Sequence, residues 1–298
     1  MGVASIQTPG LPHPTGGRRR RIRTRKLLGQ ILIYLAVLFV LVIMLTPIVW
    51  LGITSIRPLI EISTVRLNLI PDHPTLHNYH AVFNRYHMGT LLKSTTLVSL
   101  AVVGTNLVLG APAAYAMARY NYLGGKVLFG SIVFFRMIPP IAAIVPLFML
   151  FERVHLLGSY WGLIVAHTAF KLPVTIWLLR NFFLDVPREL DDAARVDGAS
   201  TLRVLFQIAL PLIQPGLAAT AVLAFLWTWN DLLVTLVLST RTNTELLPLG
   251  LTKFVLEYGV DWGSMTAAGT IMFIPTLLFV FIAQRYLIKG LTAGGVKD

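Results

Sequence analysis

The sequence predicts an all-α integral membrane protein with six transmembrane helices. Of its 298 residues, 55% are hydrophobic and only 13% are charged, and the mean hydropathy is +0.72. These values are far from those of a soluble globular domain and place the chain in membrane lipid. Crossing a hydrocarbon core of about 30 Å takes about 20 apolar residues in a helix. The stretches that meet this length are residues 31–53, 96–118, 127–151, 160–179, 217–238 and 265–282.

The basic residues predict the orientation of these spans. Seven Arg and Lys residues lie between Arg18 and Lys26, just before the first span. Because basic segments stay on the cytoplasmic side, the amino terminus is expected in the cytoplasm, and six spans return the carboxyl terminus there. In this orientation the cytoplasmic segments hold 16 of the 25 basic residues. The net charge of +12 therefore reflects topology, and no nucleic-acid partner is expected.

The domain organisation follows from the composition of the amino terminus. Residues 1–26 combine a segment rich in Pro, Gly and Thr with the basic run, and we expect a disordered cytoplasmic tail there. Residues 27–298 form the predicted six-helix domain. The first apolar stretch is longer than the usual 7 to 15 residues of a signal peptide, so we expect it to remain as a span. Cysteine is absent, which excludes disulfides and thiol chemistry.

The connection between the fourth and fifth spans is long, cytoplasmic, and patterned as two short helices at about residues 187–211. Pro187 suits the first turn of a helix, and acidic residues follow it near the positive end of the helix dipole. Asp197 and Gly198 predict a tight turn, and the Ser200 hydroxyl can cap a second helix. Pro211 constrains the end of that helix. We expect function to reside in this segment.

The stretch DAARVDGASTLRVLFQIALP, which begins at Asp192, resembles the EAA motif of binding-protein-dependent ABC importer permeases. The spacing of acid, alanines, glycine and the final apolar residues matches throughout. Only the acid differs. The family usually has Glu at this position, whereas this sequence has Asp192, whose side chain is shorter by one methylene. With Asp197 of the turn, the residues that this resemblance assigns to ATPase docking are Asp192, Ala193, Ala194, Gly198, Ile208, Leu210 and Pro211. The small alanines beside the turn would allow a partner to approach closely.

The resemblance continues from about residue 27 to the end of the chain and points to the carbohydrate branch, typified by the smaller permease of the maltose importer. The matching segments are TLHNY from Thr75, PLF from Pro146, WND from Trp229, IPTLLFVF from Ile274 and QRYLIKGLTAGGVKD from Gln284.

The resemblance implies a type I ABC importer permease in a bacterial or archaeal cytoplasmic membrane. Its implied partners are a second homologous permease, a dimeric cytoplasmic ATPase and an extracytoplasmic solute-binding protein. ATP and Mg²⁺ would be bound by the ATPase, since the chain has no G-x-x-x-x-G-K-[ST] pattern. The chain itself would be non-catalytic, with no cofactor of its own. The docking motif is widely shared, so an importer of another solute, such as an amino acid or a polyamine, is the alternative.

Polar residues inside the spans are candidates for the solute pathway, because charge at membrane depth is costly. Arg136 and Lys171 lie close to the predicted midplane, and Asp231 is the only acid at a comparable depth. Asp231 is expected to pair with one of the two cations. Asn230 could hydrogen-bond to solute hydroxyls, and Trp229 could offer an aromatic face to a sugar ring. Interhelical polar contacts without a ligand are the alternative.

Other classes of function have little support in the sequence. Four histidines of the first outer loop could hold a metal, but only one carboxylate is near them, so no metal site is predicted. They are His73, His77, His80 and His87. An intramembrane enzyme is not expected, because His167 is the only histidine well inside a span and no catalytic motif accompanies it. A stand-alone secondary transporter is not expected either, because such proteins often have two repeated halves and this sequence has no evident internal repeat.

Overall fold

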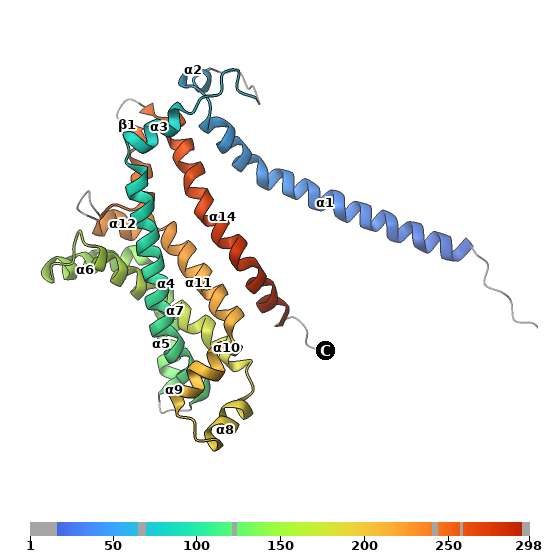
Figure 1. The fold of residues 1–298 in the computed structure, drawn as a ribbon, viewed down its shortest axis with the longest axis vertical. Helices are drawn as coiled ribbons and strands as arrows, with labels where there is room; N and C mark the ends of the chain where they lie inside the picture. The colour runs from blue at the N-terminus through green and yellow to red at the C-terminus, as the bar shows by residue number, and fades with distance from the viewer. Residues whose placement is uncertain (1–16, 65–69, 121–123, 240–243, 257–258, 294–298) are drawn as a thin grey trace, which may run out of the picture. The chain divides into compact units, whose positions relative to one another are not determined.

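The structure is a computed structural model that describes residues 17–64, 70–120, 124–239, 244–256 and 259–293 (Figure 1). Helices make up nearly all of its regular structure. In these ranges the strands are β1 (Val255–Leu256) and β2 (Gly259–Val260), which pair antiparallel. The predicted all-α class is confirmed. The chain divides into two compact units, Met1–Leu51 and Gly52–Asp298.

Helix α1 (Gly17–Ser55) provides the described part of the first unit and continues into the second. Its portion Gly29–Ser55 is long and apolar enough to cross a membrane. The basic residues 17–26, predicted to be disordered, are helical in the structure. Arginine and lysine have favourable helix propensities, so a helix formed by the apolar span extends back through them. Residues 1–16 of the predicted tail lie outside the described residues.

The second unit contains the remaining elements. Along the chain they are α2 (Leu59–Ile62), α3 (His77–Asn84), α4 (Met88–Arg119), α5 (Gly125–Met137), α6 (Pro140–Arg153), α7 (Tyr160–Leu184), α8 (Arg188–Val196), α9 (Thr201–Val204), a π-helical turn (Leu205–Ala209), α10 (Leu210–Leu212), α11 (Gln214–Trp229), α12 (Leu232–Leu238), α13 (Leu247–Thr252) and α14 (Trp262–Ala293). The most extensive helix packing is between α4 and α7.

Helices α4 and α7 run parallel to each other. Near their first turns the hydroxyls of Ser94 and Tyr160 are 2.8 Å apart, and further along both helices Thr175 donates a hydrogen bond to Asn106 at 3.3 Å. The approach is close because Gly110 has no side chain: a Cβ there would lie 2.7 Å from a methyl carbon of Thr175. Since two parallel neighbours cannot be joined by a short turn, α5 and α6 return the chain between them.

Within the described ranges, four helices are long and apolar enough to cross a membrane by themselves. They are Gly29–Ser55, Met88–Arg119, Tyr160–Leu184 and Trp262–Phe281. A fifth is added if Thr201–Leu212 and Gln214–Trp229, which meet at an angle of 81°, count as one span. The six spans and the location of the termini therefore stay predictions.

Two of the predicted spans are interrupted in the structure. The stretch 127–151 is divided between α5 and α6, because Pro139 and Pro140 lack amide donors and cannot continue the preceding helix. The stretch 217–238 is divided between α11 and α12 at Asn230 and Asp231. There the Asp231 carboxylate accepts a hydrogen bond from the backbone of Val234 and begins a new helix.

Figure 1 shows α8 and α9 at one end of the α4 and α7 pair, with α3 and the β1–β2 hairpin at the other end. Buried apolar clusters occur at both ends. One joins α4 and α7 to α8 and the π-helical turn, and another joins α3 to α4, α11, α13 and α14. The helices of the predicted docking segment are thus packed directly onto membrane-spanning helices.

Candidate functional site

The segment 187–211, called here the docking segment, has the predicted two-helix form. Pro187 precedes α8, which ends at Val196. Gly198 adopts the left-handed conformation, with φ of +83°, which permits the tight turn. The Ser200 hydroxyl accepts a hydrogen bond from the backbone of Arg203 at 3.4 Å and so caps α9. The local predictions for this segment are confirmed.

The second helix of the docking segment is less regular than predicted. After α9 the backbone forms a π-helical turn over Leu205–Ala209, followed by α10, and the chain then bends into α11. Pro211 and Pro215 flank the bend. π-helical turns are rare and often occur at functional sites. Here the turn, together with α10, joins α8 and α9 to α11.

The residues of the EAA-like motif divide between the surface and the interior. Ala194 is buried on the inner face of α8, and Ile208 and Leu210 pack against the same apolar cluster. The expectation that both alanines are exposed is therefore wrong for Ala194, which lies one helical turn from the buried Asp191 and faces the same way. The motif residues that stay exposed are Asp192, Ala193, Asp197, Gly198 and Pro211.

Three apolar side chains on this surface were not singled out from the sequence. Val196, Leu202 and Phe206 are 88%, 65% and 59% exposed. They lie on α8, α9 and the π-helical turn, beside the Gly198 turn. Large apolar groups gathered on an exposed polar element are typical of a protein contact. The spacing of four residues between Leu202 and Phe206 was the available sequence signal, since it places both on one helical face.

The docking segment is bonded to the end of α4 by a buried ion pair. Arg119 Nε lies 2.7 Å from Asp191 Oδ2, and the two side chains are only 3% and 4% exposed. The Tyr115 hydroxyl donates to the same oxygen at 2.8 Å. Burial strengthens these contacts, because little water competes for the charges.

Further contacts extend this connection, which we call the α4 junction. Arg188 donates to the carbonyl oxygen of Ala118 at 3.0 Å, and Arg195 donates to the Tyr120 hydroxyl at 2.8 Å. The hydroxyls of Tyr120 and Thr201 are 3.3 Å apart. The end of α4 is therefore held by both α8 and α9. Sequence reasoning missed this junction, because its partners are 70 or more residues apart.

A second candidate site is a cavity of about 350 Å³ between α7 and the two interrupted helices. It is called here the Lys171 cavity. Its lining residues are Phe135, Ile138, Pro140, Phe170, Lys171, Val174, Trp227, Asp231 and Val234. The breaks at Pro140 and at Asp231 both open onto it, so the interruptions that shorten these helices also shape the cavity.

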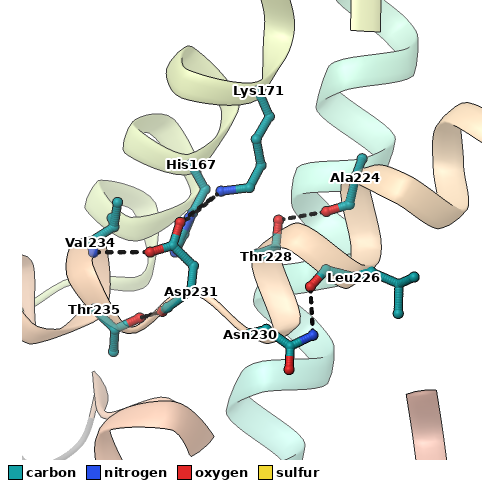
Figure 2. A network of polar contacts seen from close by, with 9 residues as sticks. All are labelled: His167, Lys171, Ala224, Leu226, Thr228, Asn230, Asp231, Val234 and Thr235. Carbon is teal, nitrogen blue, oxygen red and sulfur yellow. Dashed lines mark hydrogen bonds and ion pairs between the residues drawn. The ribbon is translucent and has the colours of Figure 1, made fainter. Parts of the chain in front are cut away.

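Lys171 and Asp231 form an ion pair at the edge of this cavity (Figure 2). Lys171 Nζ is 3.1 Å from Asp231 Oδ2 and 2.9 Å from His167 Nδ1. An ammonium group can only donate, so Nδ1 accepts and the ring is neutral. The other carboxylate oxygen of Asp231 accepts from Val234 N at 3.2 Å. The expected pairing of Asp231 with one cation is confirmed, and the cation is Lys171.

The other predicted pathway residues are placed differently. Trp229 is fully buried, with its ring stacked on Phe225, and so has no face open to a solute. Asn230 is exposed and its side chain donates to the Leu226 carbonyl, away from Asp231 in Figure 2. Trp227, two residues before Trp229, lines the cavity instead. Arg136 belongs to α5, and its side chain lies outside the described part of the structure.

At the opposite end of the unit, a larger cavity of about 920 Å³ lies among α2, α3, β2 and the start of α14. His73 and His77 of the outer loop line it, together with Arg85 and Asp261. Among the described residues, no group of three or more His, Asp or Glu side chains is arranged to hold a metal ion.

Comparisons with known proteins agree with this arrangement. The model of the family described as "binding-protein-dependent transport system inner membrane component" matches residues 106–293, which include the docking segment and the Lys171 cavity. The chain is 35% identical to the trehalose transport system permease protein SugB of Mycobacterium tuberculosis, over 89% of this chain and 97% of that protein. It is 30% identical to the sulfoquinovosyl glycerol transport system permease protein SmoH of Agrobacterium fabrum, over 90% of this chain and 94% of that protein.

The fold is also that of a solved permease. A chain of a bacterial ABC transporter involved in the import of the acidic polysaccharide alginate superposes with a TM-score of 0.76, over 93% of this chain and all of that chain, at 23% identity. The family match, the extended relatives and the fold agree with one another. The chain belongs to the family of binding-protein-dependent transport system inner membrane components, the membrane-spanning permease subunits of ABC importers.

Proposed function

We propose that the chain is the permease subunit of an importer that moves a carbohydrate across the cytoplasmic membrane of a bacterium or archaeon, driven by ATP hydrolysis on a separate subunit. The docking segment carries the proposal, since it combines a complete EAA-like spacing with an exposed two-helix surface fixed to the spans. The carbohydrate is supported by the solutes in the names of the relatives, trehalose and sulfoquinovosyl glycerol.

The docking segment is proposed to bind the cytoplasmic ATPase. Its exposed face combines the Gly198 turn with the apolar side chains of Val196, Leu202 and Phe206. A cleft of the ATPase that closes on ATP would grip this face and move it. Because the α4 junction ties the segment to α4, the movement would reach that span directly, as well as α7 and α11 through the chain itself.

In this proposal, ATP and Mg²⁺ are bound by the ATPase. The sequence has no phosphate-binding loop of the G-x-x-x-x-G-K-[ST] type, which supports a non-catalytic role for this chain. Its own chemistry would be binding, orientation and the exclusion of water around the solute.

Three further partners complete the proposed importer. A second homologous permease would close the pathway beside the Lys171 cavity, and membrane lipid would cover the apolar outer faces. A solute-binding protein would approach from outside. Helices α2 and α3 lie at the end opposite the docking segment (Figure 1), and the cavity of about 920 Å³ that they line supports that location.

The test is uptake of radiolabelled trehalose and maltose into proteoliposomes that contain this chain with its partner permease. Uptake should require ATP, the ATPase and the binding protein together. Radiolabelled glutamine and spermidine, added as competing solutes, represent the amino acid and the polyamine of the alternative. ATP-dependent uptake of either competitor but of no sugar would reject the carbohydrate. Uptake that continues without the ATPase would reject the importer.

A further inference from the structure

We propose that the Lys171 cavity binds the ring of an uncharged sugar during transport, and that the Lys171–Asp231 pair excludes sugars that carry a negative charge. This inference rests on the proposed function and deepens it. The permease itself, in addition to the binding protein, would then select the solute.

The walls of the cavity suit one face of a sugar ring. Trp227 is 38% exposed, and it faces the cavity together with Phe135 and Phe170. The C–H groups on one side of a pyranose ring form an apolar surface that packs well against aromatic side chains. The volume of about 350 Å³ is within the range of small-molecule pockets, about 300–1,000 Å³.

The polar edge of the cavity suits hydroxyl groups. Lys171 has three donors, and Asp231 and His167 occupy two of them. A carboxylate offers about four acceptor positions, and Asp231 uses one for Lys171 and one for Val234 N. The side chain of Asp231 is 22% exposed, so its remaining positions are accessible. A hydroxyl both donates and accepts, and it can therefore use both partners at once.

The charge balance of the pair argues for a neutral solute. Lys171 and Asp231 carry opposite charges, and His167 is neutral because its Nδ1 accepts from Lys171. A carboxylate or sulfonate entering the cavity would lose its hydration and meet the Asp231 carboxylate beside the lysine. Burying an uncompensated charge is costly, whereas burying a hydrogen-bonded hydroxyl is not. The relatives named for trehalose and for sulfoquinovosyl glycerol differ in the charge of their solutes, and this site predicts the uncharged class.

The test is equilibrium binding to the complete permease and ATPase complex in nanodiscs, without the binding protein. The probes are tritiated trehalose and maltose, each paired with its analogue in which one 6-hydroxymethyl group is oxidised to a carboxylate. The wild-type complex should bind the neutral sugar at least about tenfold more tightly than its carboxylate analogue. No binding of the neutral sugars, or a preference for the carboxylates, would overturn the inference.

Four variants identify the residues responsible. Asp231→Asn leaves the lysine charge uncompensated and should reduce the preference for the neutral sugar by about tenfold or more. Lys171→Met should weaken binding of both probes by about tenfold, and that of the carboxylate most. The double variant that combines Asp231→Asn with Lys171→Met restores neutrality and should recover the preference for the neutral sugar. Recovery would show that the effect of Asp231→Asn arises from the uncompensated charge and not from misfolding. Trp227→Ala should weaken both probes about equally.

Lys93→Met is the matched control, because Lys93 is exposed on α4 and outside the cavity. Its affinities should equal those of the wild type. If sugar uptake depends on this chain but the preference is the same in wild type and Asp231→Asn, the inference is wrong and the proposed function stands. If the chain supports no sugar uptake at all, the proposed function is wrong.

Discussion

Arg119 and Asp191 form a buried ion pair, with 2.7 Å between Nε and Oδ2, that joins the end of a membrane-spanning helix to the docking segment. Buried pairs add little stability, because both ions lose their hydration, but removing one partner leaves a buried charge. A pair of this kind is well suited to holding two elements in a fixed relative position. We expect it to transmit movement of α8 to α4.

Asp191→Asn should therefore impair coupling. The buried Arg119, left without its partner, would destabilise the α4 junction by about 3–5 kcal/mol and loosen the attachment of α8. We expect solute uptake to fall by about tenfold while ATP hydrolysis falls less, so that more ATP is consumed per solute molecule. The measurement is the ratio of the two rates in proteoliposomes.

The matched control is Asp185→Asn, an exposed aspartate at the end of α7. It should leave the ratio unchanged. The double change Arg119→Met with Asp191→Leu removes both charges and should restore stability without restoring the directional contact. Normal coupling in that double variant would show that the ion pair does not transmit movement.

Gly198→Trp should uncouple ATP hydrolysis from uptake while the subunit stays in the membrane. A Cβ at Gly198 would meet no atom within 4 Å, so the position is open for close approach by a partner. The left-handed backbone adds about 1–3 kcal/mol of strain for any residue with a side chain. Uptake and ATPase rates in vesicles, with subunit abundance by immunoblot, provide the measurement.

Gly124 offers a closely matched control for this change. It has φ of +84° and equally open surroundings, but it lies before α5 and outside the docking segment. Gly124→Trp should therefore carry the same backbone strain without the loss of coupling. Equal loss in both variants would attribute the effect to strain and not to docking.

Leu202→Ser and Phe206→Ser should weaken binding of the ATPase. Covering each apolar side chain at an interface is worth about 1.5–3 kcal/mol, which corresponds to about a 10- to 150-fold change in affinity. The measurement is the affinity of purified ATPase for permease complexes in nanodiscs. Leu59→Ser is the control, since this residue is 63% exposed on α2, at the other end of the unit. An unchanged affinity in both docking variants would count against this surface.

Gly216→Ala should destabilise the packing of α11 on α7. A Cβ there would lie 2.3 Å from the ring of Phe182, so the helices would have to move apart at a cost of about 1–3 kcal/mol. The unfolding temperature of the purified complex should fall. Gly130→Ala, where a Cβ would meet nothing within 4 Å, should be neutral or stabilising. Replacing Phe182 with Leu in the Gly216→Ala background should recover part of the loss.

The sequence predicted the features that depend on neighbouring residues. Pro187, the Gly198 turn and the Ser200 cap act through the local backbone, so the two helices of the docking segment were predictable. The helical class followed equally well from the long apolar stretches. The family resemblance lay in the same local spacing, and the comparisons confirmed the family.

Features that depend on distant residues were predicted less well. Pairing of Asp231 with a cation was foreseen because a lone buried acid needs a partner, but only the fold shows that Lys171 takes that role. Trp227, and not Trp229, faces the cavity, although the two residues are only two positions apart near the end of α11. The α4 junction has no local signal at all.

The opposite charges of Lys171 and Asp231 also bear on the energetics of the transport cycle. Moving one elementary charge through the membrane potential requires about 2.3 kcal/mol per 100 mV. Because the two charges move together and the expected solute has none, a conformational change at this position transfers no net charge across the field. Uptake should then be electroneutral at this step, with the same rate in polarised and depolarised vesicles.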